Sequence, residues 1–81
     1  MDDREVVQHI DELVAEEHRL RDHSTAGHPL TDADRERLGQ LEVQLDQMWD
    51  LLRRRKAREE FNENPDVETV RPPDVVENYQ Q

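Results

Sequence analysis

The sequence predicts an all-α protein, an antiparallel two-helix hairpin of the coiled-coil type followed by an extended, proline-containing tail. Apolar residues recur every three or four positions along two stretches, which is the spacing of one face of a helix. A short connection with one glycine and one proline separates the stretches, and three prolines interrupt the chain after them. We predict a hairpin over residues 1–61, with helices at about 3–24 and 32–61, and an acidic, largely irregular tail over 62–81.

The first helix begins where Asp2 or Asp3 can accept hydrogen bonds from the free N–H groups of its first turn. Its apolar residues share one stripe of the helix, because they are spaced by three, four and seven. They are Val6, Val7, Ile10, Leu13, Val14 and Leu20.

The second helix follows Thr31, a favourable N-cap residue, with acidic residues in the first turn. Its apolar stripe consists of Leu38, Leu41, Leu45, Met48, Trp49 and Leu52. Beyond Leu52 the chain turns basic, from Arg53 to Arg58, and this positive charge suits the negative end of a helix.

A short connection favours antiparallel packing of the two helices. When Leu20 is placed opposite Leu38, the apolar layers match along both helices. The same register sets Asp3 beside Arg55, so charge and apolar pattern agree.

A single interface between two helices buries few apolar side chains, and the chain has no cysteine to form a disulfide. Val7, Val14, Trp49 and Leu51 flank that interface and offer a second contact surface. We therefore expect a homodimer, most simply an antiparallel four-helix bundle.

The tail is acidic, and its prolines forbid a continuous helix. This composition favours disorder. Apolar residues in it leave a second possibility open, in which the tail lies across the hairpin or docks on a partner. They are Val67, Val70, Val75, Val76 and Tyr79.

Composition excludes several classes of function. The chain has 81 residues, 40% of them charged, and a net charge of −10, which disfavours binding to nucleic acid. No apolar run is long enough to span a bilayer and none follows Met1, so we expect a cytoplasmic protein with no membrane partner.

Glu17 occupies a position of the first stripe where an apolar residue is expected. A buried carboxylate needs a partner, and Arg21 or Arg37 can provide one. Three interpretations remain open: an acid in a polar core layer that serves a site, a paired charge that sets register or oligomeric state, or exposure near the open end.

The sequence contains no constellation typical of catalysis, and we predict no catalytic residue, metal or cofactor. The four histidines lack metal-ligand spacing. The basic run, with Asp50 four residues before Arg54, indicates charge pairing at a helix end in preference to a nucleic-acid patch, because no aromatic residue is interleaved. Trp49 is either core or an interface anchor.

Three segments carry a family resemblance: His9–Arg21, which includes Glu-Glu-His-Arg-Leu; Leu41–Arg53, which includes Leu-Asp-Gln-Met-Trp-Asp-Leu-Leu-Arg; and Val70–Pro73. They resemble a family of small, mostly actinobacterial proteins classified as a domain of unknown function, DUF2630. The resemblance covers almost the whole chain and implies a cytoplasmic bacterial protein. It implies no activity and no catalytic residue.

Two functions are therefore compared. The first is a non-enzymatic protein-interaction or regulatory module, in which the residues expected to make contacts are Glu17, Arg21, Trp49, Arg54, Arg55 and Tyr79. The alternative is a small all-helical enzyme or ligand-binding dimer, since residues 45–55 are similar to the long helix of all-helical chorismate mutases. That similarity implies a pocket for a dicarboxylate at the basic end of the second helix, although a third apolar helix is absent.

Overall fold

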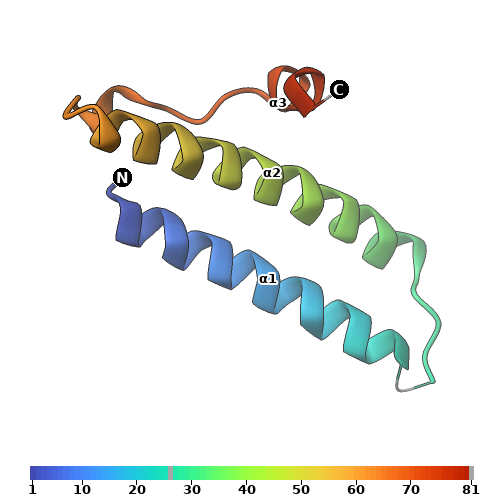
Figure 1. The fold of residues 1–81 in the computed structure, drawn as a ribbon. Coiled ribbons are helices and arrows are strands. Elements are labelled where there is room, and N and C mark those ends of the chain that lie inside the picture. The colour runs from blue at the N-terminus through green and yellow to red at the C-terminus, as the bar shows by residue number, and fades with distance from the viewer. Residues whose placement is uncertain (26, 81) are drawn as a thin grey trace.

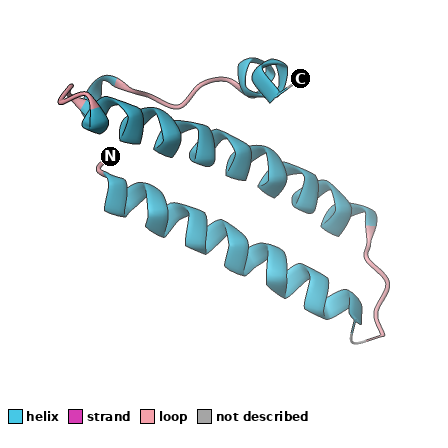
Figure 2. Cartoon of the chain, viewed as in Figure 1, coloured by secondary structure: helices cyan, strands magenta, loops and turns pink. Residues whose placement is uncertain are grey.

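The computed structural model describes residues 1–25 and 27–80, and it confirms the all-α helical hairpin (Figure 1). The elements follow in the order α1 (Asp3–Thr25), α2 (Asp32–Glu60), a short 3-10 helix η1 (Pro65–Val67) and α3 (Pro73–Gln80). Helices α1 and α2 run antiparallel, and the chain after α2 returns along the side of α2 that faces away from α1 (Figure 2). Helix α2 is therefore the central element, in contact with every other one.

The molecule is elongated. Its principal extents are 50 × 26 × 16 Å and its radius of gyration is 15.2 Å, against about 12 Å for a compact domain of this length. The shape follows from laying two long helices side by side with only a short segment added. Among the described residues, no helix combines the length and apolarity needed to cross a bilayer.

Both long helices begin with a reciprocal cap. The carboxylate of Asp2 accepts from the Glu5 N–H at 2.8 Å while Glu5 reaches back to the Asp2 N–H. Thr31 and Asp34 form the same arrangement at the start of α2, as the sequence predicts. Because Asp2 makes the cap of α1, the carboxylate of Asp3 is left for a contact with α2.

A turn after α2 sends the chain back along the same helix. Asn62 takes a left-handed conformation with φ 56°, which asparagine tolerates better than most residues. The Glu63 N–H donates to the Arg58 carbonyl at 2.8 Å and so closes the helix end. The side chain of Asn64 then accepts from the Asp66 N–H and starts η1.

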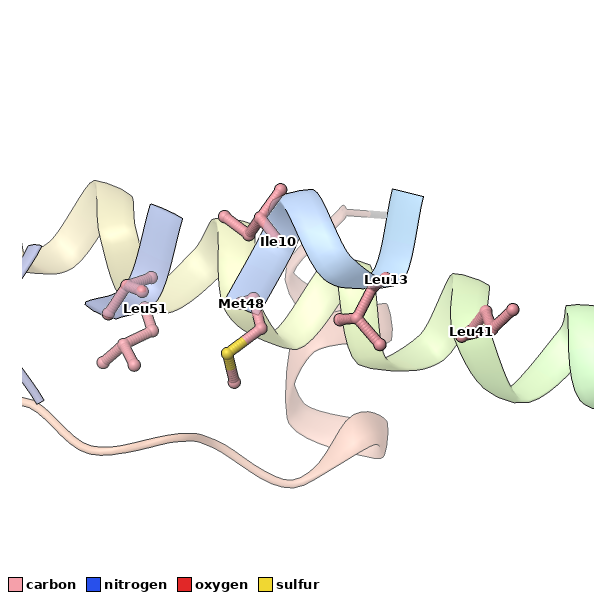
Figure 3. Close-up of a cluster of buried hydrophobic side chains, with 6 residues drawn as sticks. Ile10, Leu13, Leu41, Met48 and Leu51 are labelled. Atoms are coloured by element: carbon pink, nitrogen blue, oxygen red, sulfur yellow. The ribbon is translucent and has the colours of Figure 1, made fainter. Parts of the chain in front are cut away.

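The core lies between α1 and α2 and contains most of the predicted stripe residues (Figure 3). Its buried members are Val6, Ile10, Leu13, Leu41, Met48 and Leu51, and the partly buried Val14, Leu20, Leu38, Leu45 and Leu52 pack against them. The periodicity of the sequence therefore located the core face of both helices.

The structure separates Leu51 from Trp49, two residues that the sequence places together beside the interface as part of a second contact surface. Leu51 is only 2% exposed and belongs to the core, contrary to that expectation, whereas Trp49 is 45% exposed. The reason is the C-terminal segment: Gln47 and Arg54, on the same side of α2 as Leu51, both bind it. That side of α2 is covered, and the side that carries Trp49 is not.

The C-terminal segment (residues 62–80) is more regular than predicted, because Pro73–Gln80 forms α3. Pro73 can begin a helix, since the first turn needs no N–H donor from that residue. The Pro72 carbonyl accepts from the N–H groups of Val75 and Val76. Val76 is 2% exposed, while Val67, Val70 and Val75 remain exposed. Among the four valines of this segment, Val76 is thus the one that packs in the interior.

Candidate interaction surfaces

Arg54 joins α2 to the C-terminal segment. Its Nε donates to the buried Asp50 carboxylate at 3.0 Å, and its Nη2 lies 2.9 Å from the same carboxylate oxygen. Its Nη1 donates to Glu68 at 2.6 Å, and Nη2 also donates to the Thr69 carbonyl at 2.7 Å. This planar guanidinium, held on all sides, fixes the segment in an extended path along the helix.

Arg55, the next residue of α2, joins three parts of the chain. Its Nε donates to Asp3 of α1 at 2.7 Å, and its Nη1 donates to the Pro65 carbonyl and the Asp66 carboxylate at 3.2 and 3.1 Å. The Asp3–Arg55 pair confirms the helix register that the charge pattern predicts. Lys56 donates to the second Asp3 oxygen at 2.9 Å. These hydrogen bonds hold the pKa of Asp3 well below its usual range.

Arg58 completes the basic side of the contact. It donates from Nε to Glu68 at 2.9 Å and from Nη1 to Glu63 at 2.6 Å. Hydrogen bonds from Arg58 and Arg54 lower the pKa of Glu68 from its ordinary value. Sequence reasoning missed Glu63 and Glu68 as partners, although acids soon after a basic run and beyond a turn are a signal for such pairing.

We expect acidification to weaken attachment of the C-terminal segment. Because the pKa of Glu68 is lowered in the folded protein, its contribution to stability is complete above its ordinary pKa of 4.5. That contribution is lost as the pH falls through the lowered value. Urea unfolding measured between neutral pH and about pH 3 should show a fall in the free energy of unfolding. In the Glu68→Gln variant, this free energy should depend less on pH. An unchanged dependence in Glu68→Gln would assign it to other carboxylates.

Glu17 is paired, as one of the open interpretations expects. Its side chain is 22% exposed, and its carboxylate lies 3.7 Å from Arg21, which also lies 3.7 Å from Glu42 of α2. Arg37, the other candidate partner, binds Glu16 instead and donates to it at 2.8 Å. Glu16 directly precedes Glu17 and faces Arg37. The hydrogen bond from Arg37 lowers the pKa of Glu16. Glu17 and Arg21 are thus part of the contact between the helices.

Two further expectations concern residues of other kinds. The side chain of Tyr79 lies outside the described part of the structure, so its role in contacts stays a prediction. In that described part, no three histidine, aspartate or glutamate side chains gather where they could hold a metal ion. His23 and His28 stack with ring centroids 4.8 Å apart, across the connection between α1 and α2.

An exposed apolar strip lies along the edge of the hairpin. Asp3, Val7, Val14 and Arg21 follow one another at intervals of four and seven on α1, so they lie along one side of that helix. Glu42, Trp49 and Lys56 do the same on α2 at intervals of seven. The ion pairs Asp3–Lys56 and Arg21–Glu42 join the two rows at their ends.

Between these ion pairs, the edge is apolar. Trp49 is 45% exposed and Val7 is 43% exposed, and the half-buried Val14 lies beside them in the row on α1. Trp49 also borders a shallow hollow on α2, lined by Leu52, Arg53, Lys56, Ala57 and Glu60. We call the strip formed by Val7, Val14, Trp49 and Leu52 the Trp49 edge.

These features define a small helical-hairpin protein in which an acidic C-terminal segment is bound to the basic end of the second helix. The chain belongs to the family described as protein of unknown function (DUF2630), whose sequence profile matches residues 2–81. Uncharacterised proteins of Mycobacterium tuberculosis and Mycobacterium bovis are 42% identical to it over 77 residues, which cover 95% of this chain and 88% of each relative. No solved structure matches the chain.

Proposed function

We propose that the chain is a non-enzymatic protein-interaction module that self-associates through the Trp49 edge. The exposure of Trp49 supports the proposal most strongly, because a large exposed aromatic side chain in an apolar patch with a polar border is typical of an interface anchor. The neighbouring valines extend this apolar surface onto α1. A second copy of the chain is the partner we propose, in agreement with the homodimer that the sequence predicts.

The thin core supports the same conclusion. Among the described residues, six apolar side chains are buried between α1 and α2. In a chain of this size such a core usually needs support from a further contact. The C-terminal segment supplies part of that support on one side of α2. The Trp49 edge lies on the uncovered side, where a second copy would bury it.

The alternative, a dicarboxylate-binding pocket at the basic end of α2, has less support. That pocket would need guanidinium groups ready to receive an anion. Arg54 and Arg55 already bind carboxylates of the chain itself, Asp50 and Glu68 in one case and Asp3 and Asp66 in the other. A dianion would have to displace these groups before it could bind.

Sedimentation of the Trp49→Glu variant tests the proposal. We expect the wild-type chain to be dimeric at micromolar concentration and Trp49→Glu to be monomeric with unchanged helicity, because a charge at the interface opposes burial. Phe61→Glu is the matched control, since Phe61 is an exposed aromatic residue beyond the end of α2. A monomeric wild type, or a Trp49→Glu variant that still dimerises, would contradict the proposal.

A further inference from the structure

We propose that in the self-associated protein α2 packs antiparallel against α2 of the second copy, with the two-fold axis beside Trp49. In this arrangement Asp46 of each copy faces Arg53 of the other, and Glu42 of each copy faces Lys56 of the other. The inference rests on the proposed self-association. It adds which helices meet, in which direction and at which register.

The charges on the uncovered side of α2 change sign at Trp49. Glu42 and Asp46 precede it by seven and three residues, and Arg53 and Lys56 follow it by four and seven. All four side chains are exposed or half-buried. Acidic and basic groups thus stand at nearly equal distances on either side of the tryptophan.

Such a pattern complements itself when the helix is turned end over end. In an antiparallel pair centred beside Trp49, each residue before the centre faces one at the same distance after it. Asp46 then comes within one residue, about 1.5 Å along the axis, of Arg53 of the second copy. Each attraction occurs twice because the interface is symmetric. A parallel pair in register would instead place like charges opposite one another.

Asp46 and Arg53 are available for this contact. Neither makes a hydrogen bond or an ion pair with any other residue in the described part of the chain. Seven residues of helix separate them by about 10 Å, so they cannot pair within one helix. The contacts within the described part of the chain therefore give the charges of Asp46 and Arg53 no role in the fold of a single copy.

The ends of the Trp49 edge fit the same arrangement. Lys56 lies 2.9 Å from Asp3, and Glu42 lies 3.7 Å from Arg21. When Lys56 of one copy meets Glu42 of the other, the two intramolecular pairs join in a row of alternating charge. This row would border the apolar strip at both ends and exclude water from the tryptophans.

Charge reversal at Asp46 and Arg53 in the full chain tests the register. Asp46→Arg or Arg53→Asp places two like-charge pairs in the interface, and we expect each to raise the Kd of the dimer about tenfold. The variant that carries both substitutions restores opposite charges, and we expect its Kd to return to within about threefold of the wild-type value. Sedimentation at low salt measures all four proteins.

Glu12 and Arg19 provide the matched control, since they are exposed on α1 and are also seven residues apart. Reversal of either charge should leave the Kd within about threefold of the wild-type value. A wild-type dimer in which the double reversal at Asp46 and Arg53 fails to restore affinity would overturn the register and leave the proposed self-association intact. A wild type that is monomeric throughout would overturn both.

Discussion

Replacement of Arg55 by alanine is expected to lower the free energy of unfolding by about 2–3 kcal/mol. The Arg55 side chain is only 4% exposed and joins Asp3 of α1 to the carbonyl of Pro65 and to Asp66. Without the guanidinium, Asp3 loses one of its two cationic partners and the buried contact with the C-terminal segment loses its donors. Urea unfolding followed by circular dichroism measures the change.

Lys56→Ala is the control for Arg55. Lys56 binds the same carboxylate of Asp3 but is 57% exposed, and an exposed pair contributes only about 0–1 kcal/mol. If the two variants lost equal stability, burial of Arg55 and its contact with residues 65 and 66 would contribute nothing measurable. The comparison should be made at a protein concentration where the wild type is monomeric, since Lys56 also lies in the proposed interface.

Leu51→Ala is expected to cost about 2–4 kcal/mol of stability, the usual range for a leucine deleted from a core. Leu51 is 2% exposed and belongs to the core cluster. It lies on the side of α2 that binds the C-terminal segment. The surrounding helices cannot close the resulting cavity fully. Thermal and urea unfolding of the variant measure the loss.

Trp49→Ala should leave the stability of the single chain nearly unchanged, despite the larger side chain removed, because Trp49 is nearly half exposed. This measurement also requires a concentration at which no dimer forms, since dimerisation raises apparent stability by mass action. A variant at Trp49 that proved more destabilising than one at Leu51 would place the tryptophan in the core of the single chain and contradict the structure.

Most of the helical hairpin could be predicted from local signals. The α2 cap at Thr31, the bounds of both long helices and their core faces depend on residues near one another in the chain. The register needed one long-range comparison, and the Asp3–Arg55 contact confirms it. Charge and apolar spacing are both periodic along a helix, so they report the same alignment independently.

The candidate surfaces were predicted less completely. Arg54, Arg55 and Trp49 were singled out from the sequence, and so was the pairing of Arg54 with Asp50. The carboxylates of the C-terminal segment that bind Arg54 and Arg58 were not. Glu63 and Glu68 lie in a segment whose composition favours disorder, and no periodic pattern indicates where such a segment will lie. Its position depends on specific hydrogen bonds to arginines that are distant in the chain.

By itself, the sequence determined two amphipathic helices, where each begins, and how they align, because helix periodicity and end charges are encoded by neighbouring residues. Only the tertiary structure decided which side of α2 is covered. Arg54 and Gln47 bind the returning C-terminal segment, so Leu51 becomes part of the core and Trp49 remains at the surface. The spacing of apolar residues along a helix shows which face can be buried, but burial itself depends on which segment packs against that face. Here the C-terminal segment covers one side of α2, and it is held there by hydrogen bonds between residues that are distant in the sequence.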